Sequence, residues 1–214
     1  MGMVTRACTI ATASAYDADG LRVYRSENGG TERLTWDSAN ALPVILSDSK
    51  GSMYGYGQEL ILDETLGIPT YYQQDGLGST VLTTAATGTP TTAPAYDVYG
   101  KARTLTPTFG YAGEQADSTG TVYLRARQYD PELGRFQTMD PLRGLPESTP
   151  TLNRFTYVAN LPTQLVDPTG NFGFSTGGKI DLGHLSFSAK TKWFDINGWN
   201  PLDWKLPQGR SQSR

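Results

Sequence analysis

The sequence predicts an all-β protein built from short antiparallel hairpins, and three observations support this fold class. The 214 residues include 24 Gly and 13 Pro but only 18% charged residues, a balance that favours tight turns over long surface helices. Seven of the 14 Asp have a Gly three residues later, well above what random placement would give. No segment of ten or more residues has clear helical spacing, whereas polar and apolar residues alternate after several turns.

The Asp-to-Gly spacing is typical of hairpin turns. The Asp accepts hydrogen bonds from the amides that follow it, and the Gly takes the left-handed conformation that closes the hairpin. The pairs are Asp17/Gly20, Asp48/Gly51, Asp75/Gly78, Asp97/Gly100, Asp117/Gly120, Asp167/Gly170 and Asp195/Gly198. We therefore interpret Gly100, Gly120 and Gly170 as turn glycines that need no ligand, and we interpret Gly134 in the same way.

In chain order, residues 1–15 come first, as a segment that is disordered, a frayed first strand, or an arbitrary start within a longer gene. A signal peptide is not convincing there, because Thr9 and Thr12 interrupt its short apolar stretch. Residues 16–108 hold the hairpins. Within them, residues 83–94 (TTAATGTPTTAP) have few apolar anchors and are expected to form a mobile loop.

The composition changes after Gly170. The first 170 residues carry 12 basic and 18 acidic side chains, whereas the last 44 carry 6 and 3. These 44 residues also contain the only His, His184, and three of the four Trp. We expect a boundary near residue 171 and a distinct segment over 171–214.

Several classes of function are disfavoured. The net charge of −3 means that the chain as a whole has no excess of positive charge with which to attract nucleic acid, so nucleic-acid binding is not expected. No stretch approaches the roughly 18 apolar residues of a membrane span. The single Cys8 cannot form an internal disulfide, and no His or Cys cluster has the spacing of a metal site, so neither a metal nor a cofactor is expected.

Two sets of motifs resemble a known family. Residues 16–20 (YDADG), 71–79 (YYQQDGLGS) and 96–101 (YDVYGK) are similar to the tyrosine-aspartate (YD) repeats of Rhs proteins. Residues 109–144 (FGYAGEQADSTGTVYLRARQYDPELGRFQTMDPLRG) and 153–170 (NRFTYVANLPTQLVDPTG) resemble the Rhs repeat-associated core of bacterial polymorphic toxins and of the shell-forming subunit of insecticidal toxin complexes.

The resemblance implies an architecture and an activity. The repeats over 16–108 would form a β-hairpin ribbon, part of a hollow β-shell, and the core over 109–170 would end it, followed by a short variable payload or remnant over 171–214. The core of that family is an aspartyl autoprotease acting once in cis. By motif, its acidic pair would be Asp140 and Asp167, its basic partner Arg127, and its cleavage site the bond between Asn171 and Phe172.

The chemistry suits those residue types. Two facing carboxylates do not both ionise easily, so one can hold a proton while the other activates water. A guanidinium could orient a carboxylate or stabilise the oxyanion. Because the bond to be cut is tethered beside its catalyst, the effective concentration is high and one turnover suffices.

Other interpretations remain open. Asp167 is equally a turn residue, Arg127 a strand arginine that is solvated or ion-paired, and His184 a plain strand side chain. The whole chain could be a non-catalytic structural module that binds a carbohydrate or a protein, or residues 171–214 could be a nuclease-type toxin. Expected partners are further YD-repeat chain or shell and an immunity protein, in a secreted or cell-surface bacterial protein.

Overall fold

The computed structural model describes residues 12–27, 30–39, 42–57, 59–141, 152–171, 173–175, 179–181 and 186–188, and all statements below concern these residues. They confirm the all-β fold class, because nearly every described element is an antiparallel strand. Among these residues no helix has both the length and the apolar character needed to cross a membrane.

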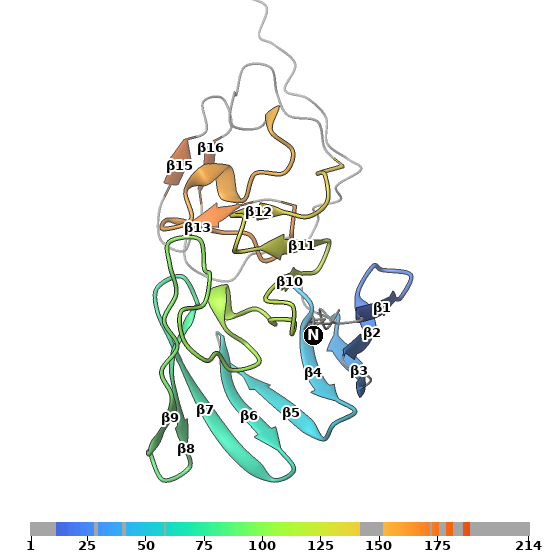
Figure 1. The fold of residues 1–214 in the computed structure, drawn as a ribbon, viewed down its shortest axis with the longest axis vertical. Helices are drawn as coiled ribbons and strands as arrows, with labels where there is room; N and C mark the ends of the chain where they lie inside the picture. The colour runs from blue at the N-terminus through green and yellow to red at the C-terminus, as the bar shows by residue number, and fades with distance from the viewer. Residues whose placement is uncertain are drawn as a thin grey trace, which may run out of the picture.

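The larger unit is a nine-stranded antiparallel sheet in which the spatial order of the strands is their chain order (Figure 1). Register shifts in five of its pairings mark irregularities of the kind that increase twist. The strands are β1 (Thr12–Tyr16), β2 (Arg22–Glu27), β3 (Gly30–Asp37), β4 (Val44–Asp48), β5 (Ser52–Tyr56), β6 (Leu60–Thr65), β7 (Ile68–Gln74), β8 (Thr80–Ala85) and β9 (Pro90–Thr92). The first strand thus begins four residues before Tyr16, where the hairpins were expected to start.

The turns that begin with Asp and end with Gly share one hydrogen-bond pattern. In all six described Asp/Gly pairs the Gly has φ between +71° and +96° and its amide donates to the Asp carbonyl. In the turn at Asp97, for example, the carboxylate also accepts from the amides of Tyr99 and Lys101, each at 2.9 Å. The spacing in the sequence therefore marks tight turns. Three of them, at Asp17, Asp48 and Asp75, connect strands of the nine-stranded sheet, and the other three lie after it. The seventh pair, Asp195/Gly198, lies outside the described residues.

The expectation of a mobile loop over 83–94 is wrong. This stretch includes the end of β8, a tight turn and β9, and Thr83 and Thr91 share a hydrogen bond between hydroxyls at 2.8 Å. Gly88 has φ +80° and donates to the Ala85 carbonyl, so the turn forms without an Asp. Thr-rich segments pair well because β-branched side chains favour strands, which an argument from low complexity overlooks.

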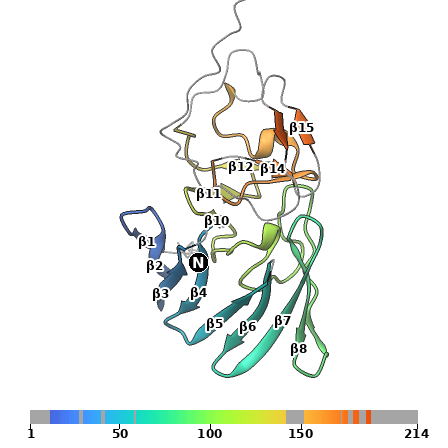
Figure 2. The ribbon, with the colours of Figure 1, turned by 180° about the vertical axis from the view of Figure 1, so that it is seen from behind.

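The second unit lies at one end of the sheet, as Figures 1 and 2 show from opposite sides. It consists of small antiparallel pairings and two single-turn 3-10 helices. Its elements are η1 (Tyr111–Gly113), β10 (Val122–Leu124), β11 (Arg127–Asp130), β12 (Arg135–Phe136), η2 (Val158–Asn160), β13 (Leu165–Val166) and β14 (Phe174–Ser175), with β15 (Lys179–Asp181) and β16 (Ser186–Ser188) beyond them.

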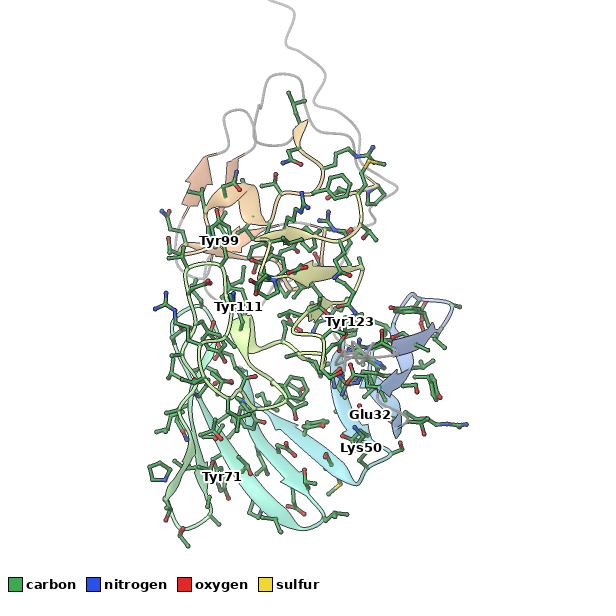
Figure 3. All side chains as sticks on the ribbon, viewed as in Figure 1. Glu32, Lys50, Tyr71, Tyr99, Tyr111 and Tyr123 are labelled. Atoms are coloured by element: carbon green, nitrogen blue, oxygen red, sulfur yellow. The ribbon has the colours of Figure 1, made fainter. Side chains whose placement is uncertain are left out.

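Each unit has its own hydrophobic core, and residues 109–111 pass from one core to the other. Phe109 packs edge-on against Tyr54 in the sheet core, with ring centroids 4.9 Å apart. Two residues later, Tyr111 belongs to the second core with Tyr129 and Tyr157. Figure 3 shows Tyr111 where the sheet meets the upper unit. This crossing fixes the second unit, and with it the acidic pair, against the end of the ribbon.

Candidate functional site

The structure brings together the three residues named by motif. Arg127 begins β11, Asp140 follows β12, and Asp167 starts the turn after β13. One guanidinium nitrogen of Arg127, Nη2, lies 2.9 Å from Oδ2 of Asp140 and 3.7 Å from Oδ2 of Asp167. Arg127 and Asp167 are buried, with 6% and 2% of their surface exposed, and Asp140 is partly exposed. One cation thus holds two carboxylates that are 27 residues apart in the chain.

Aromatic and main-chain contacts fix the position of Arg127. Its guanidinium carbon lies 3.6 Å from the ring centroid of Phe136, a cation–π arrangement. Its Nη1 donates to the carbonyl of Arg154 at 3.3 Å, and that same carbonyl accepts from the Asp140 amide at 2.9 Å. Arg154 in turn donates from its side chain to the Asp140 carbonyl. Residues around Arg154 therefore set the position of Asp140 beside Arg127.

The turn over 167–170 (DPTG) is held against the start of β11. Nε of Arg127 donates to the Gly170 carbonyl, and the Ala126 amide donates to the Thr169 carbonyl at 3.2 Å. Gly170 has φ +71°, and a Cβ atom there would lie 2.2 Å from the Leu124 carbonyl oxygen. Only glycine fits this position, because both the backbone angle and the neighbouring main chain exclude a side chain.

The carboxylate of Asp167 also holds the residue at which cleavage was expected. Its Oδ1 accepts a hydrogen bond from the Asn171 amide at 3.1 Å and one from the Thr169 hydroxyl at 3.0 Å. The Asn171 amide also lies 3.2 Å from the Thr169 hydroxyl oxygen. Asp167 is thus a turn residue and a member of the acidic pair at once. Asn171 is directly beside the pair, whereas Phe172 lies outside the described residues.

Burial dominates the electrostatics of Arg127. Desolvation lowers the pKa of its guanidinium, while Asp140 and Asp167 act in the opposite direction. An arginine remains protonated in proteins, so the site combines one buried cation with two acidic groups. Such a set can take up and return a proton at a carboxylate, and it can stabilise developing negative charge at the guanidinium.

Sequence reasoning missed Arg125, which joins three segments around the site. Its Nε donates to the Pro43 carbonyl at 2.9 Å, and its Nη1 contacts Glu114 at 2.8 Å and the Pro168 carbonyl. Burial raises the pKa of Glu114, and the charge of Arg125 counteracts that rise. Arg125 and Arg127 are two residues apart, which is the spacing of side chains on one face of a strand. Their different roles arise because Arg125 lies in the turn before β11, with φ +56°.

A second charged cluster joins the sheet to the core and was also missed. Asp117 forms ion pairs with Arg22 at 2.8 Å and with Arg25 at 2.9 Å. Arg25 also forms an ion pair with Glu32, at 2.5 Å. Arg22 has no exposed surface, and its guanidinium carbon lies 4.1 Å from the ring centroid of Tyr123. Figure 3 shows Glu32 beside Lys50, which contacts it from the next turn at 3.4 Å. No local pattern marks this cluster, because Asp117 is more than 90 residues from Arg22 and Arg25 in the chain.

His184, the three Trp after Gly170 and Cys8 lie outside the described residues. The four glycines interpreted as turn glycines are all described, and φ is +84° at Gly100, +83° at Gly120, +65° at Gly134 and +71° at Gly170.

Comparisons with known proteins support the Rhs/YD-repeat-like relationship. No protein-family model matches the sequence. The chain is 26% identical over 202 residues to the tRNA nuclease WapA of Bacillus subtilis (strain 168), and the match covers 88% of this chain but only 8% of WapA. The chain therefore spans less than a tenth of the length of that relative.

Solved structures of toxin complexes share the fold. A Photorhabdus luminescens Tc holotoxin pore with a mutation in TccC3 matches with a TM-score of 0.56 and 20% identity, over 80% of this chain and 9% of the other. TcdB2-TccC3 without its hypervariable C-terminal region matches with a TM-score of 0.54 and 20% identity, over 78% of this chain and 9% of the other. At this level of identity the likeness concerns the fold.

Proposed function

We propose that this chain is the C-terminal part of an Rhs/YD-repeat toxin-type protein, in which the ribbon ends a β-shell and the core cuts the chain once, between Asn171 and Phe172. The observation that carries the proposal is the position of Arg127 between Asp140 and Asp167, with Asp167 hydrogen-bonded to the Asn171 amide. The bond to be cut directly follows the turn that Asp167 begins.

In the proposed reaction a carboxylate acts as the base and Arg127 stabilises negative charge on the attacked carbonyl. Such electrostatic stabilisation is effective in a buried site because little water screens it. The hydrogen bonds of Asp167 and Arg127 to residues 170 and 171 hold the substrate segment in place before reaction. The orientation that a bimolecular enzyme must obtain through binding is here built into the fold.

The test is the intact mass of the full chain after expression. We expect a C-terminal fragment that begins at Phe172, and its loss in Asp140→Asn and Asp167→Asn. Asp97→Asn is the matched control, because Asp97 occupies the same kind of turn without contacting Arg127. If the wild-type chain stays intact for days between pH 4 and 8, the proposed protease function is wrong. The same fold would then be interpreted as a non-catalytic structural module.

The two fragments are expected to stay together after cleavage. β14 pairs with β13 through Leu165↔Ser175 and Val166↔Phe174, and the cut lies in the connection between these strands. The C-terminal piece should therefore co-elute with the core in gel filtration under native conditions and separate in denaturant. Separation without denaturant would show that this pairing does not retain the segment.

The relative named as a tRNA nuclease favours a second candidate function. By analogy with that relative, the C-terminal segment 171–214 would be a nuclease-type payload or its remnant. Its partner would be an immunity protein. Incubation of the isolated segment with labelled tRNA tests this function, and an unchanged tRNA at micromolar peptide excludes it. The segment carries a net +3, which suits an anionic substrate.

The ribbon also points to a partner. β1 is the first strand of the sheet and pairs only with β2 among the described residues. A strand in this position offers backbone groups with which another strand can pair. Further YD-repeat chain, or the shell that it forms, would pair with this edge through backbone hydrogen bonds. The whole protein would be secreted or located at the cell surface. Expression with preceding repeats should make this edge resistant to hydrogen exchange, and unchanged exchange would exclude the pairing.

A further inference from the structure

We infer that Arg125 is a positioning residue for the cut, one that joins the turn over 167–170 to the loop before β4, so that the acidic pair is in place only when the core is docked on the ribbon. The inference rests on the proposed self-cleavage and deepens it by naming what regulates the site. We assign Arg125 no step of the chemistry. It acts through the turn that Asp167 begins.

The first observation is that Arg125 occupies a backbone position at which glycine is usual. Leu124 pairs with Arg127 across the tight turn between β10 and β11. Arg125 is therefore the first of two turn residues, and its φ is +56°. Two-residue hairpin turns with a positive φ at the first position usually have Gly there, because a side chain crowds the backbone in that conformation. The contacts of the Arg125 side chain have to offset this cost.

The second observation is that Arg125 begins a run of contacts with the turn over 167–170. Three successive carbonyl groups of that turn accept hydrogen bonds from three successive residues at the start of β11 and just before it. The Pro168 carbonyl accepts from Nη1 of Arg125, the Thr169 carbonyl from the Ala126 amide at 3.2 Å, and the Gly170 carbonyl from Nε of Arg127. Arg125 therefore holds the residue that directly follows Asp167, the acidic group beside Arg127.

The third observation is that the same guanidinium contacts the ribbon. Its Nε donates to the carbonyl of Pro43, which directly precedes β4, at 2.9 Å. Its Nη1 lies 2.8 Å from Glu114, whose amide donates to the Tyr111 carbonyl where the chain passes from one hydrophobic core to the other. The side chains of Arg125 and Glu114 are only 12% and 13% exposed, so water does not readily replace a lost contact. One side chain thus ties the turn of Asp167 to two segments that the folded ribbon holds in place.

The first arm of the test compares two Arg→Lys variants of the full chain. Arg125→Lys keeps the positive charge beside Glu114. A single ammonium cannot span the carbonyl groups of Pro43 and Pro168 as the planar guanidinium does. We expect cleavage, followed by intact mass, to slow by about 10- to 100-fold, because a small misplacement of a catalytic group has an effect of this size. Arg135→Lys changes an exposed arginine of β12 and should cleave like the wild type. Cleavage of Arg125→Lys at the wild-type rate overturns the inference.

The second arm measures the position of the turn without relying on cleavage. Amide hydrogen exchange is recorded in Asp140→Asn, which keeps the chain intact under the proposed function. Addition of Arg125→Lys should speed exchange of the Ala126 and Asn171 amides roughly 10-fold, because both are bonded to groups of this turn. The Gly100 amide, bonded within a separate turn, should not change. Unchanged exchange at Ala126 and Asn171 overturns the inference even if cleavage slows. If the wild-type chain is never cleaved, the proposed function is wrong, and this arm still decides whether Arg125 holds the turn.

The third arm tests the link to the ribbon with a double-mutant cycle. Pro43→Gly keeps the carbonyl that Arg125 binds but frees its backbone, and we expect cleavage to slow by about 3-fold. In Arg125→Lys the same change should have little further effect, because the contact is already lost. Equal slowing in both backgrounds, or slowing in neither, overturns the inference that the ribbon sets the site.

A second variant covers the case in which Arg125→Lys does not fold, as judged by near-UV circular dichroism from the buried tyrosines. Arg125→Gly combined with Glu114→Gln then takes its place in all three arms. Gly suits the left-handed backbone, and Gln leaves no unpaired charge in the partly buried position. We expect the same slowing of cleavage and the same faster exchange, and wild-type values of both overturn the inference.

Discussion

Gly170 lies so close to Leu124 that a methyl group on it would be 2.2 Å from the Leu124 carbonyl oxygen. Gly120 has nearly the same backbone, with φ +83° against +71°, but a Cβ atom there would have no neighbour within 4 Å. Substitutions at these two glycines therefore separate two contributions to stability, the cost of a left-handed backbone angle and the cost of a clash with neighbouring atoms.

We therefore expect Gly120→Ala to lower the free energy of unfolding by about 1–2 kcal/mol, the usual penalty for a left-handed alanine. Gly170→Ala should cost about 1–3 kcal/mol more, because the main chain of Leu124 and Arg127 must move. Urea unfolding of both variants measures the difference. Equal losses would mean that the turn over 167–170 is not packed against β11 as described.

The turn glycines of the ribbon allow a second prediction. Gly88 has φ +80° and open space around it, whereas a Cβ atom on Gly100 would lie 2.4 Å from ring atoms of Tyr111. We expect Gly88→Ala to cost as much as Gly120→Ala, and Gly100→Ala to cost more because the Tyr111 ring must shift. Thermal melts of the three variants rank them. A negligible loss of stability in Gly88→Ala would instead support the mobile loop that was expected from the sequence.

Asp117 provides a test of the cluster that joins the sheet to the core. Asp117→Asn leaves Arg22 and Arg25 with less compensation in a buried place, and we expect a loss of about 3–5 kcal/mol. Glu132→Gln is the control, because its pair with Lys101 is exposed at 48% and 65% and should contribute less than about 1 kcal/mol. Similar losses in the two variants would indicate that the cluster is solvated.

Asp48 leads to a prediction about acid stability. Burial opposes ionisation of its carboxyl, but hydrogen bonds from the Tyr54 hydroxyl and from the amides of Ser52 and Lys50 prevail, so its pKa is lowered. A group whose pKa is lower in the folded state stabilises the protein above its unfolded pKa of about 3.9, and that stability is lost as the pH falls through the folded pKa.

In Asp48→Asn the fall in stability below about pH 4 should accordingly be less steep than in the wild type. Tyr54→Phe removes one of the hydrogen bonds and should give an intermediate slope. Unfolding free energies measured in urea between pH 7 and pH 2 give the slopes. Parallel curves for the three proteins would contradict the assignment of the carboxylate to this turn.

The parts of this structure that could be predicted from the sequence are those with local causes. A turn of the kind at Asp97 and Gly100 depends on residues within four positions of each other, so the Asp-to-Gly spacing reveals it directly. The acidic pair followed from a resemblance in motifs, and the structure places Asp140 and Asp167 at one guanidinium.

The parts that could not be predicted depend on distant segments. Arg22 follows a hairpin turn and looks like a solvated strand residue, yet it is fully buried against Tyr123 and Asp117, about a hundred residues later. Arg125 reaches Pro43 and Pro168 because its left-handed backbone turns the side chain away from the pattern of its neighbours. Low complexity over 83–94 concealed a hairpin that Thr side chains stabilise.

The chain-order arrangement of the nine strands has a consequence for biosynthesis. Each strand pairs with the one made just before it, so the ribbon can assemble progressively as the polypeptide leaves the ribosome. The group formed by Arg127, Asp140 and Asp167 can assemble only after residue 167 has been made. It also requires residues 109–111 to have packed against the sheet, as Phe109 does against Tyr54. The order of synthesis therefore delays the assembly of the acidic pair until the turn over 167–170 has been made.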